Sequence, residues 1–475
     1  MRKIRLLLPI AILLLSVSCT KQSPNEVQKK EDDTPSLSEE SRTTEFARIL
    51  AKALNKKEVR ELLKQEALKK FDKDYDVLYQ LSKDVQADNG KSLQQLIKES
   101  AEDSTAFIKM IEELPLVTIF IPELGNFNPR DWNTENEIPI VAVRNASGKK
   151  RGEQLITFDS NGNQGTASYT ETPKVPVLVV KENERVSYNN NGSVNNGREA
   201  ENKNAFLRTS GKTFSFVDKC YDGLSPEFDD NTNSRIFFGV DPLASYARQH
   251  NISPVRDYIY YGIDPSTGTN SGPLKANYAE FLMGIAVNSV ASKSLIVDWT
   301  DGMLEFRLTT FFIPNAGAVS SITKNFPADP IRLFPSGGTP GDVSLTSTPL
   351  EIANWDMQKY GDTWKLSLIE YDPGAEFTYS TSFSSTFGIN FGLDANTGQV
   401  VKVGLKFGVS STTTRSETVT MKITDAADNL GEALLDYSTP LEGDSYVVPG
   451  GGVQYKPYTI STGIMTIYIT TRKRF

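Results

Sequence analysis

The residues that could perform catalytic chemistry are few. The 475-residue chain contains one histidine, His250, and two cysteines, Cys19 and Cys220. A single histidine excludes the H-E-x-x-H zinc proteases and every other site that needs two histidines. A Ser-His-Asp arrangement would have to use His250, and no G-x-S-x-G elbow offers the serine. We therefore interpret His250 as an ordinary surface residue.

Two short stretches imitate ligand-binding motifs but lack residues that the chemistry requires. Residues 211–213 (GKT) look like the end of a phosphate-binding loop, but Phe206 stands where its first glycine belongs. Asp159 opens a calcium-like loop in which Gln164 replaces the turn glycine and Thr170 replaces the bidentate glutamate. A hairpin turn is the better interpretation of this loop.

Acidic and aromatic residues leave one enzymatic alternative open. The 59 Asp and Glu residues nominate no catalytic pair, yet a glycan hydrolase needs only two carboxylates that converge in space. Aromatic residues could stack on sugar rings, although large aromatics usually dominate the core. Those considered are Trp132, Trp299, Trp355, Trp364 and the cluster at 258–261.

Metal and cofactor sites are not predicted, and no catalytic residue is assigned. Five aspartates could gather at loops and bind calcium, but nothing in their spacing requires it. They are Asp298, Asp301, Asp356, Asp362 and Asp372.

The N-terminus predicts where the protein is located. Cations at Arg2, Lys3 and Arg5 precede an apolar run at 6–15, and small residues follow directly before Cys19. This is the architecture of a secretory signal peptide at 1–18. The apolar run is shorter than the roughly 20 residues that span a bilayer as a helix.

The stretch 15–19 (LSVSC) resembles the lipobox of bacterial lipoproteins, with Ser16 where leucine is usual. The resemblance implies that the signal peptide is cut before Cys19, that this cysteine receives a diacylglycerol and that the new N-terminus is acylated. It predicts a lipid-anchored protein of the bacterial cell envelope. Thr20 does not resemble the aspartate that retains some lipoproteins at the inner membrane, which favours the outer membrane.

Charge and cysteine content limit the partners. Without the signal peptide the chain keeps 48 basic and 59 acidic residues, a net charge of about −11. Such a chain is a poor candidate for nucleic-acid binding, and its membrane partner is reached through the lipid. Once Cys19 is lipidated, Cys220 is the remaining thiol, so we interpret it as a small buried apolar residue.

The composition changes along the chain predict a mainly β protein with an N-terminal α-helical segment and a C-terminal antiparallel β-sandwich. Ser92 begins a capping box that should open one of the helices. Residues 279–290 are read as a short helix. The expected order is a polar lipidated tether at 19–43, a helical segment at 44–114, a small β domain at 115–210, a mixed connecting region at 211–294 and the sandwich at 295–475, with strands at 295–299, 304–313, 363–371, 377–393, 400–409, 415–424 and 464–470.

The most regular pattern lies at 377–393, where apolar and small polar residues alternate. A six-residue turn at 394–399 leads to a second alternating run at 400–409. One face of such a hairpin is buried by construction, so a sandwich hairpin is the simpler interpretation. Membrane-crossing strands need about 9–11 residues, so both runs are also long enough to enter a bilayer. The face that would contact a membrane or ligand contains Phe377, Tyr379, Phe383, Phe387 and Phe391.

The Ser- and Thr-rich flanks of this hairpin are similar in composition to the insertion segments of aerolysin-like pore-forming toxins. That resemblance implies a membrane-inserting hairpin. Three hypotheses result. The leading one is a non-catalytic envelope lipoprotein that binds a glycan or protein partner or assists assembly. The alternatives are a carboxylate-based glycan hydrolase and a membrane-inserting β-hairpin protein.

Overall fold

The computed structural model describes residues 38–144, 154–169, 171–189, 206–209, 212–223, 256–264, 267–297, 299–300, 302–314, 317–345, 348–372, 376–387, 391–393, 400–402, 413–424, 427–437, 439–447 and 453–474. The signal peptide, Cys19, most of the tether at 19–43 and His250 lie outside these residues. No helix within the described ranges is long and apolar enough to cross a membrane.

Helices open the described chain, and local capping explains where they begin. The predicted capping box is confirmed, because Gln95 N–H donates to Ser92 Oγ at 3.2 Å and Ser92 N–H donates to Gln95 Oε1 at 2.8 Å. The first helix begins at Glu39, inside the stretch predicted as tether, because Ser38 Oγ accepts a hydrogen bond from Ser41 N–H. The helices are α1 (Glu39–Ala53), α2 (Lys57–Ala67), α3 (Tyr79–Ser82), α4 (Leu93–Lys98) and α5 (Ser104–Glu112).

These helices share one hydrophobic core with a six-stranded sheet of order β1-β2-β6-β3-β4-β5. Neighbouring strands run antiparallel except β3 and β6, which are parallel. Helix α1 packs on β3, so the predicted helical segment and the start of the predicted β domain form one layered unit. The strands are β1 (Asp76–Leu78), β2 (Val117–Phe120), β3 (Ile140–Val143), β4 (Gln154–Phe158), β5 (Gln164–Ser168) and β6 (Val177–Glu182).

A small sheet of order β7-β9-β8 follows, and Cys220 packs beneath it. Its strands are β7 (Val186–Asn189), β8 (Phe206–Thr209) and β9 (Lys212–Phe216), and a 3-10 turn η1 (Lys219–Tyr221) comes next. Burial raises the pKa of the Cys220 thiol, with Asp218 adding to the effect. The thiolate that a nucleophile needs is therefore disfavoured.

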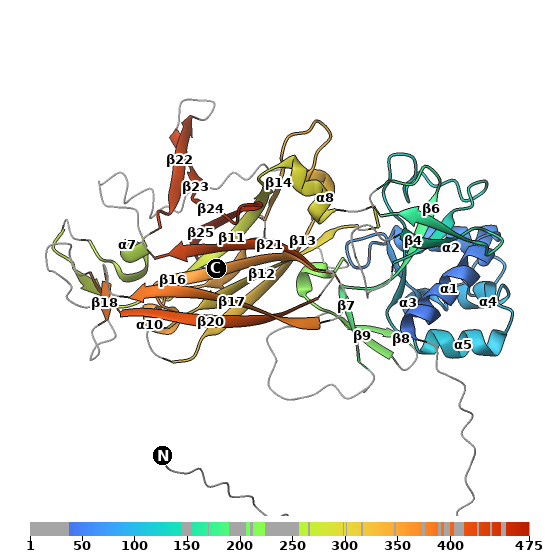
Figure 1. Ribbon diagram of the computed structural model, residues 1–475, viewed down its shortest axis with the longest axis horizontal. Helices are drawn as coiled ribbons and strands as arrows, with labels where there is room; N and C mark the ends of the chain where they lie inside the picture. Colours follow the sequence, from blue (N-terminus) through green and yellow to red (C-terminus); the bar gives the residue numbers. More distant parts are fainter. Residues whose placement is uncertain are drawn as a thin grey trace, which may run out of the picture. The chain divides into compact units, whose positions relative to one another are not determined.

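The C-terminal part contains two antiparallel sheets that share a second core, so the predicted sandwich-like, mainly β fold is confirmed (Figure 1). One sheet has the order β14-β11-β25-β24, with β15 also paired to β11; the other has the order β13-β12-β16-β21. The strands are β11 (Tyr278–Val287), β12 (Leu304–Phe312), β13 (Ser320–Ala328), β14 (Asp342–Ser344), β15 (Leu350–Ala353), β16 (Thr363–Glu370), β21 (Asp428–Asp436), β24 (Thr459–Ser461) and β25 (Met465–Lys473).

Two sequence-based assignments in this region are wrong. Residues 279–290 were expected to be helical, but most of them form strand β11. Both faces of β11 are buried, since Leu282 contacts the sandwich core and Phe281 a separate apolar cluster on the other side. A strand buried on both faces has no alternation that would distinguish it from a helix. Residues 295–299 were expected to form a strand, but helix α8 (Lys293–Ile296) occupies the first two of these positions.

A two-stranded hairpin forms a further layer against the β12–β16 sheet. Strand β17 (Glu376–Phe387) pairs with β20 (Thr413–Thr424) over twelve positions, from Glu376 opposite Thr424 to Phe387 opposite Thr413. Figure 1 shows the two strands lying side by side along the lower part of the view. We refer to this pair of strands as the outer hairpin.

The expected pairing of 377–393 with 400–409 is correct only near its turn. Strand β18 (Phe391–Leu393) pairs with β19 (Val400–Lys402), whereas the longer β17 pairs with β20 instead. Strand β10 (Ser271–Gly272) pairs with the other edge of β19. The remaining elements are α7 (Arg256–Tyr261), η4 (Val290–Ser292), α9 (Pro330–Leu333), α10 (Met357–Tyr360), β22 (Glu442–Val447) and β23 (Val453–Pro457).

The sandwich core should determine stability, and two leucines on neighbouring strands test this. Leu366 is fully buried in the core, whereas Leu434 on β21 is 49% exposed. Leu366→Ala should lower the free energy of unfolding by about 2–5 kcal/mol, because it leaves a cavity. Leu434→Ala should change it by about 0.5 kcal/mol or less. Urea denaturation of both variants measures the difference, and equal losses would contradict this description of the core.

Candidate functional site

The outer hairpin contains the residues that the sequence analysis selected as a membrane or ligand face. Phe383 is buried with Val419 of β20 against Phe311 and Ile313 of the underlying sheet. Phe377 lies toward the base of the hairpin and is 46% exposed. Tyr379 is partly buried, and its hydroxyl donates to Glu432 Oε1 at 3.4 Å. Of the three selected residues with described side chains, only Phe383 is thus fully buried.

Two of the selected phenylalanines are located only by their strands. Phe387 ends β17 and Phe391 begins β18, and their side chains lie outside the described part of the structure.

Polar groups share the space beneath the outer hairpin with this apolar cluster. Lys365 of β16 is buried and pairs with Glu432 of β21, with Nζ and Oε2 2.7 Å apart. Lys365 Nζ also donates to the Thr381 hydroxyl and, at 3.1 Å, to the Ser382 carbonyl. Thr381 in turn donates to Glu432 Oε2 at 3.0 Å. The contact between the outer hairpin and the underlying sheet therefore combines apolar packing with hydrogen bonds.

The opposite face of the outer hairpin consists mainly of hydroxyl side chains. The predicted alternation of β17 is confirmed at 378–384, where the even-numbered residues are exposed and the odd-numbered ones are partly or fully buried, but not at Phe377, which is exposed. The exposed hydroxyl residues are Thr378, Ser380, Ser382 and Ser384 on β17 and Ser416, Thr418 and Thr420 on β20. Such a face offers many donors and acceptors. Its charges are Glu376 and Lys422 at the base of the hairpin, where Lys422 Nζ lies 3.1 Å from Glu376 Oε2.

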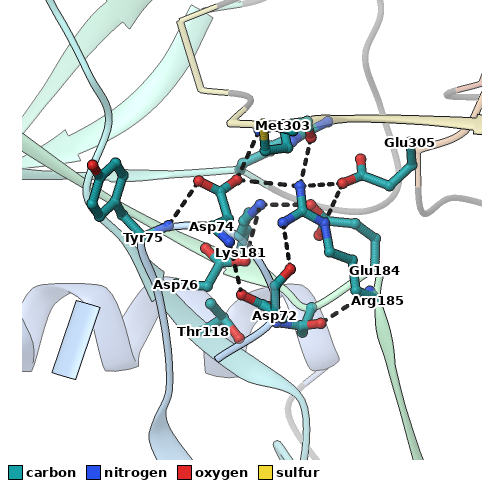
Figure 2. Close-up of polar contacts among 12 residues, drawn as sticks. Asp72, Asp74, Tyr75, Asp76, Thr118, Lys181, Glu184, Arg185, Met303 and Glu305 are labelled. Atoms are coloured by element: carbon teal, nitrogen blue, oxygen red, sulfur yellow. Dashed lines mark hydrogen bonds and ion pairs between the residues drawn. The ribbon is translucent and has the colours of Figure 1, made fainter. Parts of the chain in front are cut away.

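A second candidate site is a buried ionic cluster (Figure 2), which the sequence analysis missed. Its side chains come from the segment that leads into β1, from β6 and the turn after it, and from the start of β12. All are buried: Asp72, Asp74, Asp76, Lys181, Glu184, Arg185 and Glu305.

Arg185 is the centre of this cluster, and Figure 2 shows its guanidinium between the carboxyl groups. Its Nε donates to Glu305. Its Nη2 donates to the Met303 carbonyl at 2.6 Å and to Asp74 Oδ2 at 3.2 Å. Its Nη1 donates to the Asp72 carbonyl at 3.0 Å. One side chain therefore connects the segment before β1 with the beginning of β12.

Charge balance within the cluster requires bound protons. Five carboxyl groups surround the cations Lys181 and Arg185, and an uncompensated buried charge is costly. Burial raises the pKa of Asp76 well above its usual range, against the attraction of Lys181, whose Nζ lies 3.6 Å from Asp76 Oδ2. Neither Asp76 oxygen has a hydrogen-bond partner among the described residues. Asp76 is therefore the group that we expect to be protonated at neutral pH.

The other carboxyl groups differ from Asp76 because of their partners. Burial, opposed by Arg185, raises the pKa of Glu305 to about 8. Burial also acts on Glu184, but the charges of Lys181 and Arg185 outweigh it and lower the pKa of Glu184. Lys181 Nζ donates to Glu184 Oε1 at 2.6 Å. The cluster therefore combines ionised and protonated carboxyl groups in one buried site.

The geometry indicates a structural connection rather than a reaction centre. Met303 N–H donates to Asp74 Oδ2 at 2.9 Å, and a Cβ at Gly302 would overlap the Asp74 carboxylate, so a glycine is needed there. A second ion pair nearby joins Arg144, after β3, to Asp372, after β16. Within the described residues, no group of three or more His, Cys, Asp or Glu side chains is arranged to bind a metal ion.

The structure assigns most of the other sequence candidates to structural roles. All four tryptophans are buried, so they do not form an exposed sugar-stacking platform. The cluster at 258–261 lies within α7, and Tyr260 and Tyr261 are buried. Asp159 lies in the tight turn between β4 and β5, where Oδ1 accepts from Asn161 N–H and Asn163 N–H at 2.9 Å each, which confirms the predicted hairpin turn.

Three of the five aspartates considered for calcium, Asp356, Asp362 and Asp372, lie within the described residues. Asp356 caps α10, and Asp372 pairs with Arg144. Asp298 and Asp301 lie outside the described residues.

The segments that form most of the ionic cluster carry a recognisable charge pattern in the sequence. Asp72, Asp74 and Asp76 alternate as they enter a strand, and 181–185 (KENER) directly follows an apolar strand. Charges next to buried strands are usually solvent-exposed, so the pattern alone does not distinguish a surface from a buried cluster.

The stability of the folded protein should report the protonation of Asp76. The folded protein keeps a proton on Asp76 that the unfolded chain releases above a pKa of about 4. The contribution of this group to stability is therefore complete in acid and is lost as the pH rises toward and through the folded-state pKa. Asp76→Asn resembles the protonated form, so it should melt at a higher temperature than the unmodified chain at alkaline pH and at the same temperature in acid. Melting followed by circular dichroism across pH measures this, and lower melting of the variant at alkaline pH would show that Asp76 is ionised.

Asp103→Asn supplies a control of opposite sign. Asp103 is exposed and caps α5, and hydrogen bonds from the Ala106 and Thr105 backbone lower its pKa. Its contribution is present above the unfolded pKa and is lost as the pH falls. Asp103→Asn should therefore lower the melting temperature at neutral pH and have a smaller effect in acid.

Comparisons of the chain with protein-family models, with curated proteins and with solved structures return no match.

Proposed function

We propose that this chain is a lipid-anchored, non-catalytic protein of the bacterial envelope that acts by binding, with the outer hairpin as its binding element. The observation on which this depends most is the hairpin itself. Two twelve-residue strands form a separate layer with a hydroxyl-rich outer face, attached to the sandwich through a partly polar contact. A layer of this kind can be used for an interaction without opening the sandwich core.

The roles of the reactive residues support a non-catalytic protein. Cys220 is buried with a raised pKa, and the carboxyl groups of the ionic cluster are engaged around Arg185 and Lys181 away from solvent. A catalytic group has to reach a substrate, and these groups do not reach the surface.

The glycan hydrolase alternative loses the aromatic residues that suggested it. Trp132, Trp299, Trp355 and Trp364 pack inside the protein, and Trp355 stacks on Trp364 with 3.9 Å between ring centroids. No pair of exposed carboxylates is singled out by the described geometry. We therefore keep the binding function as the proposal.

The lipid anchor supplies the first test. Cells supplied with radiolabelled palmitate should label the unmodified protein and its Cys220→Ala variant equally, because the Cys220 thiol is buried. Cys19→Ser should lose the label and should move from the membrane fraction to the soluble fraction, because the acyl chains provide about 0.8 kcal/mol per buried CH₂. Retention of label and membrane association by Cys19→Ser would contradict the proposal, as would polysaccharide turnover that a single carboxylate substitution abolishes.

A further inference from the structure

We propose that Lys181 and Asp76 condense with each other inside the folded protein and form an amide bond between their side chains. This is a covalent modification site within the buried ionic cluster, and it needs neither a cofactor nor an external substrate. The inference goes beyond the proposed function and does not depend on it. The bond makes covalent a structural connection that otherwise consists of ion pairs and hydrogen bonds.

The register of the six-stranded sheet places Lys181 and Asp76 on one face, although strand β2 separates β1 from β6. Asp76 is opposite Phe120 of β2. Phe120 is in turn opposite Val179 of β6, two positions before Lys181. Because opposite residues and residues two apart share a face of a sheet, all four side chains lie on the same side. The long lysine side chain therefore reaches across β2, with Nζ 4.9 Å from the centre of the Phe120 ring.

The three groups that the reaction needs are buried and close together. Lys181 Nζ, the nucleophile, lies 3.6 Å from Asp76 Oδ2, an oxygen of the carboxyl group that it attacks (Figure 2). Nζ also donates to Glu184 Oε1 at 2.6 Å, which makes Glu184 the proton acceptor. Neither Asp76 oxygen has a hydrogen-bond partner among the described residues, so no hydrogen bond within them has to break before this carboxyl group reacts.

The protonation states that the attack requires follow from the same contacts. Burial raises the pKa of Asp76, so its carboxyl group carries a hydroxyl that leaves as water. Burial opposes the charge on Lys181, but the attraction of Asp76 and Glu184 outweighs it and raises the pKa of Lys181. Transfer of one proton from Nζ to Glu184, along the existing hydrogen bond, gives the neutral amine. Because the bond forms once and then persists, a small population of the neutral amine is sufficient.

The atoms and charges of the reaction balance within the cluster. Of the three protons on Lys181 Nζ, one passes to Glu184, one leaves with the Asp76 hydroxyl as water, and one remains on the amide nitrogen. The new bond joins Nζ to Asp76 Cγ, and the bond from Cγ to the hydroxyl oxygen breaks. The positive charge of Lys181 and the negative charge of Glu184 are both neutralised. The reaction therefore removes two charges from a site where burial of charge is costly.

Burial also favours the amide over its hydrolysis. In bulk water an amine and a carboxyl group do not condense, because water is abundant and the two groups rarely meet. Lys181 is 2% exposed and Asp76 is 0% exposed, so the released water leaves a site from which other water is excluded. Well-oriented groups within one molecule react as if they were present at about 10⁵–10⁸ M, which is far above the concentration of water.

A second buried lysine lacks this arrangement. Lys365 Nζ lies 2.7 Å from Glu432 Oε2, and the Glu432 side chain is 23% exposed. The same oxygen accepts a hydrogen bond from the Thr381 hydroxyl at 3.0 Å. Its carboxylate is therefore hydrogen-bonded and partly hydrated, unlike that of Asp76. Lys365 accordingly supplies the matched control for a buried lysine beside a carboxylate.

The amide links β1 to β6 and closes a long loop, because Asp76 and Lys181 are 105 positions apart in the sequence. Cross-links that close long loops stabilise a protein mainly by restricting its unfolded chain. Once the bond has formed, neither Asp76 nor Lys181 carries a charge. The pH dependence attributed to Asp76 above therefore applies to chains in which the bond has not formed, and their mass identifies them.

Peptide mass spectrometry of the full chain, purified from cells in detergent, tests the proposal. Trypsin cuts after unmodified lysine and arginine, so an unlinked chain gives separate peptides 74–83 and 175–181. The amide blocks the cut after Lys181. The linked chain should therefore give peptides 74–83 and 175–185 as one species, lighter than the two together by one water molecule.

Three folded variants, checked by circular dichroism, are compared with the unmodified chain. Lys181→Met keeps a long side chain without the amine and should give no linked species. Glu184→Gln keeps the shape but does not accept the proton. Its linked fraction at a fixed time after synthesis should fall by about tenfold or more, because transfer to a positioned group contributes about 10²–10⁴-fold to a rate. Lys365→Met, the matched control, should be linked to the same extent as the unmodified chain.

Three results would count against the proposal. Recovery of peptide 74–83 entirely in its free form from the folded, unmodified chain would overturn it. Loss of water within peptide 175–185 alone would also overturn it, because Lys181 would then be bonded to Glu184 instead of Asp76. Equal linking in the Glu184→Gln variant and the unmodified chain would overturn the role assigned to Glu184.

Discussion

The connection through Arg185 is the interaction on which the arrangement of the described chain most depends. Its guanidinium bonds to the segment before β1 through Asp74 and to the first residues of β12 through Glu305 and the Met303 carbonyl. In the sequence Arg185 is 111 residues from Asp74, 118 from Met303 and 120 from Glu305. An apolar side chain could fill the space, but it could not satisfy several acceptors in fixed directions, which the planar five-donor group of arginine does. The cost of burying the surrounding carboxyl groups is reduced by protonation, which makes the connection sensitive to pH.

This connection and the outer hairpin lie on the same strand. Positions 305 and 311 differ by an even number, so Glu305 and Phe311 are on the same face of β12. Glu305 contacts Arg185, whereas Phe311 lies beneath Phe383 of the hairpin. A second path passes through Asp372, whose carboxylate pairs with Arg144 and whose carbonyl accepts a hydrogen bond from the Thr424 hydroxyl at the base of β20. The hairpin base is therefore attached to the helical part of the protein by specific polar contacts. Farther along the hairpin, Arg415 donates to the Pro314 and Gly317 carbonyls.

The sequence predicted the elements whose signals are local and missed those that depend on distant partners. The capping box at Ser92 and the strands β12 and β16 follow from neighbouring residues and from uninterrupted β-rich runs. Strand β11 could not be recognised from its own residues, because a strand buried on both faces shows no alternation of apolar and polar residues. Alternation of apolar and polar residues located β17 but not its partner β20. A period of two shows which residues share a face of a strand, but it does not show which strand pairs with it. The ionic cluster could not be predicted, because its charges become buried only when β1, β6 and β12 meet.

Strand β16 shows why the two faces of one sheet behave differently. Trp364, Leu366 and Leu368 face the sandwich core, and alternate positions place Lys365 toward the outer hairpin. Had an apolar residue stood at 365, the hairpin would lie on a continuous hydrophobic surface, and its removal would expose that surface to water. With Lys365 paired to Glu432, removal instead hydrates two charges that are already matched. The same alternation therefore builds an apolar core on one side of the strand and a partly charged, hydrogen-bonded contact with the outer hairpin on the other.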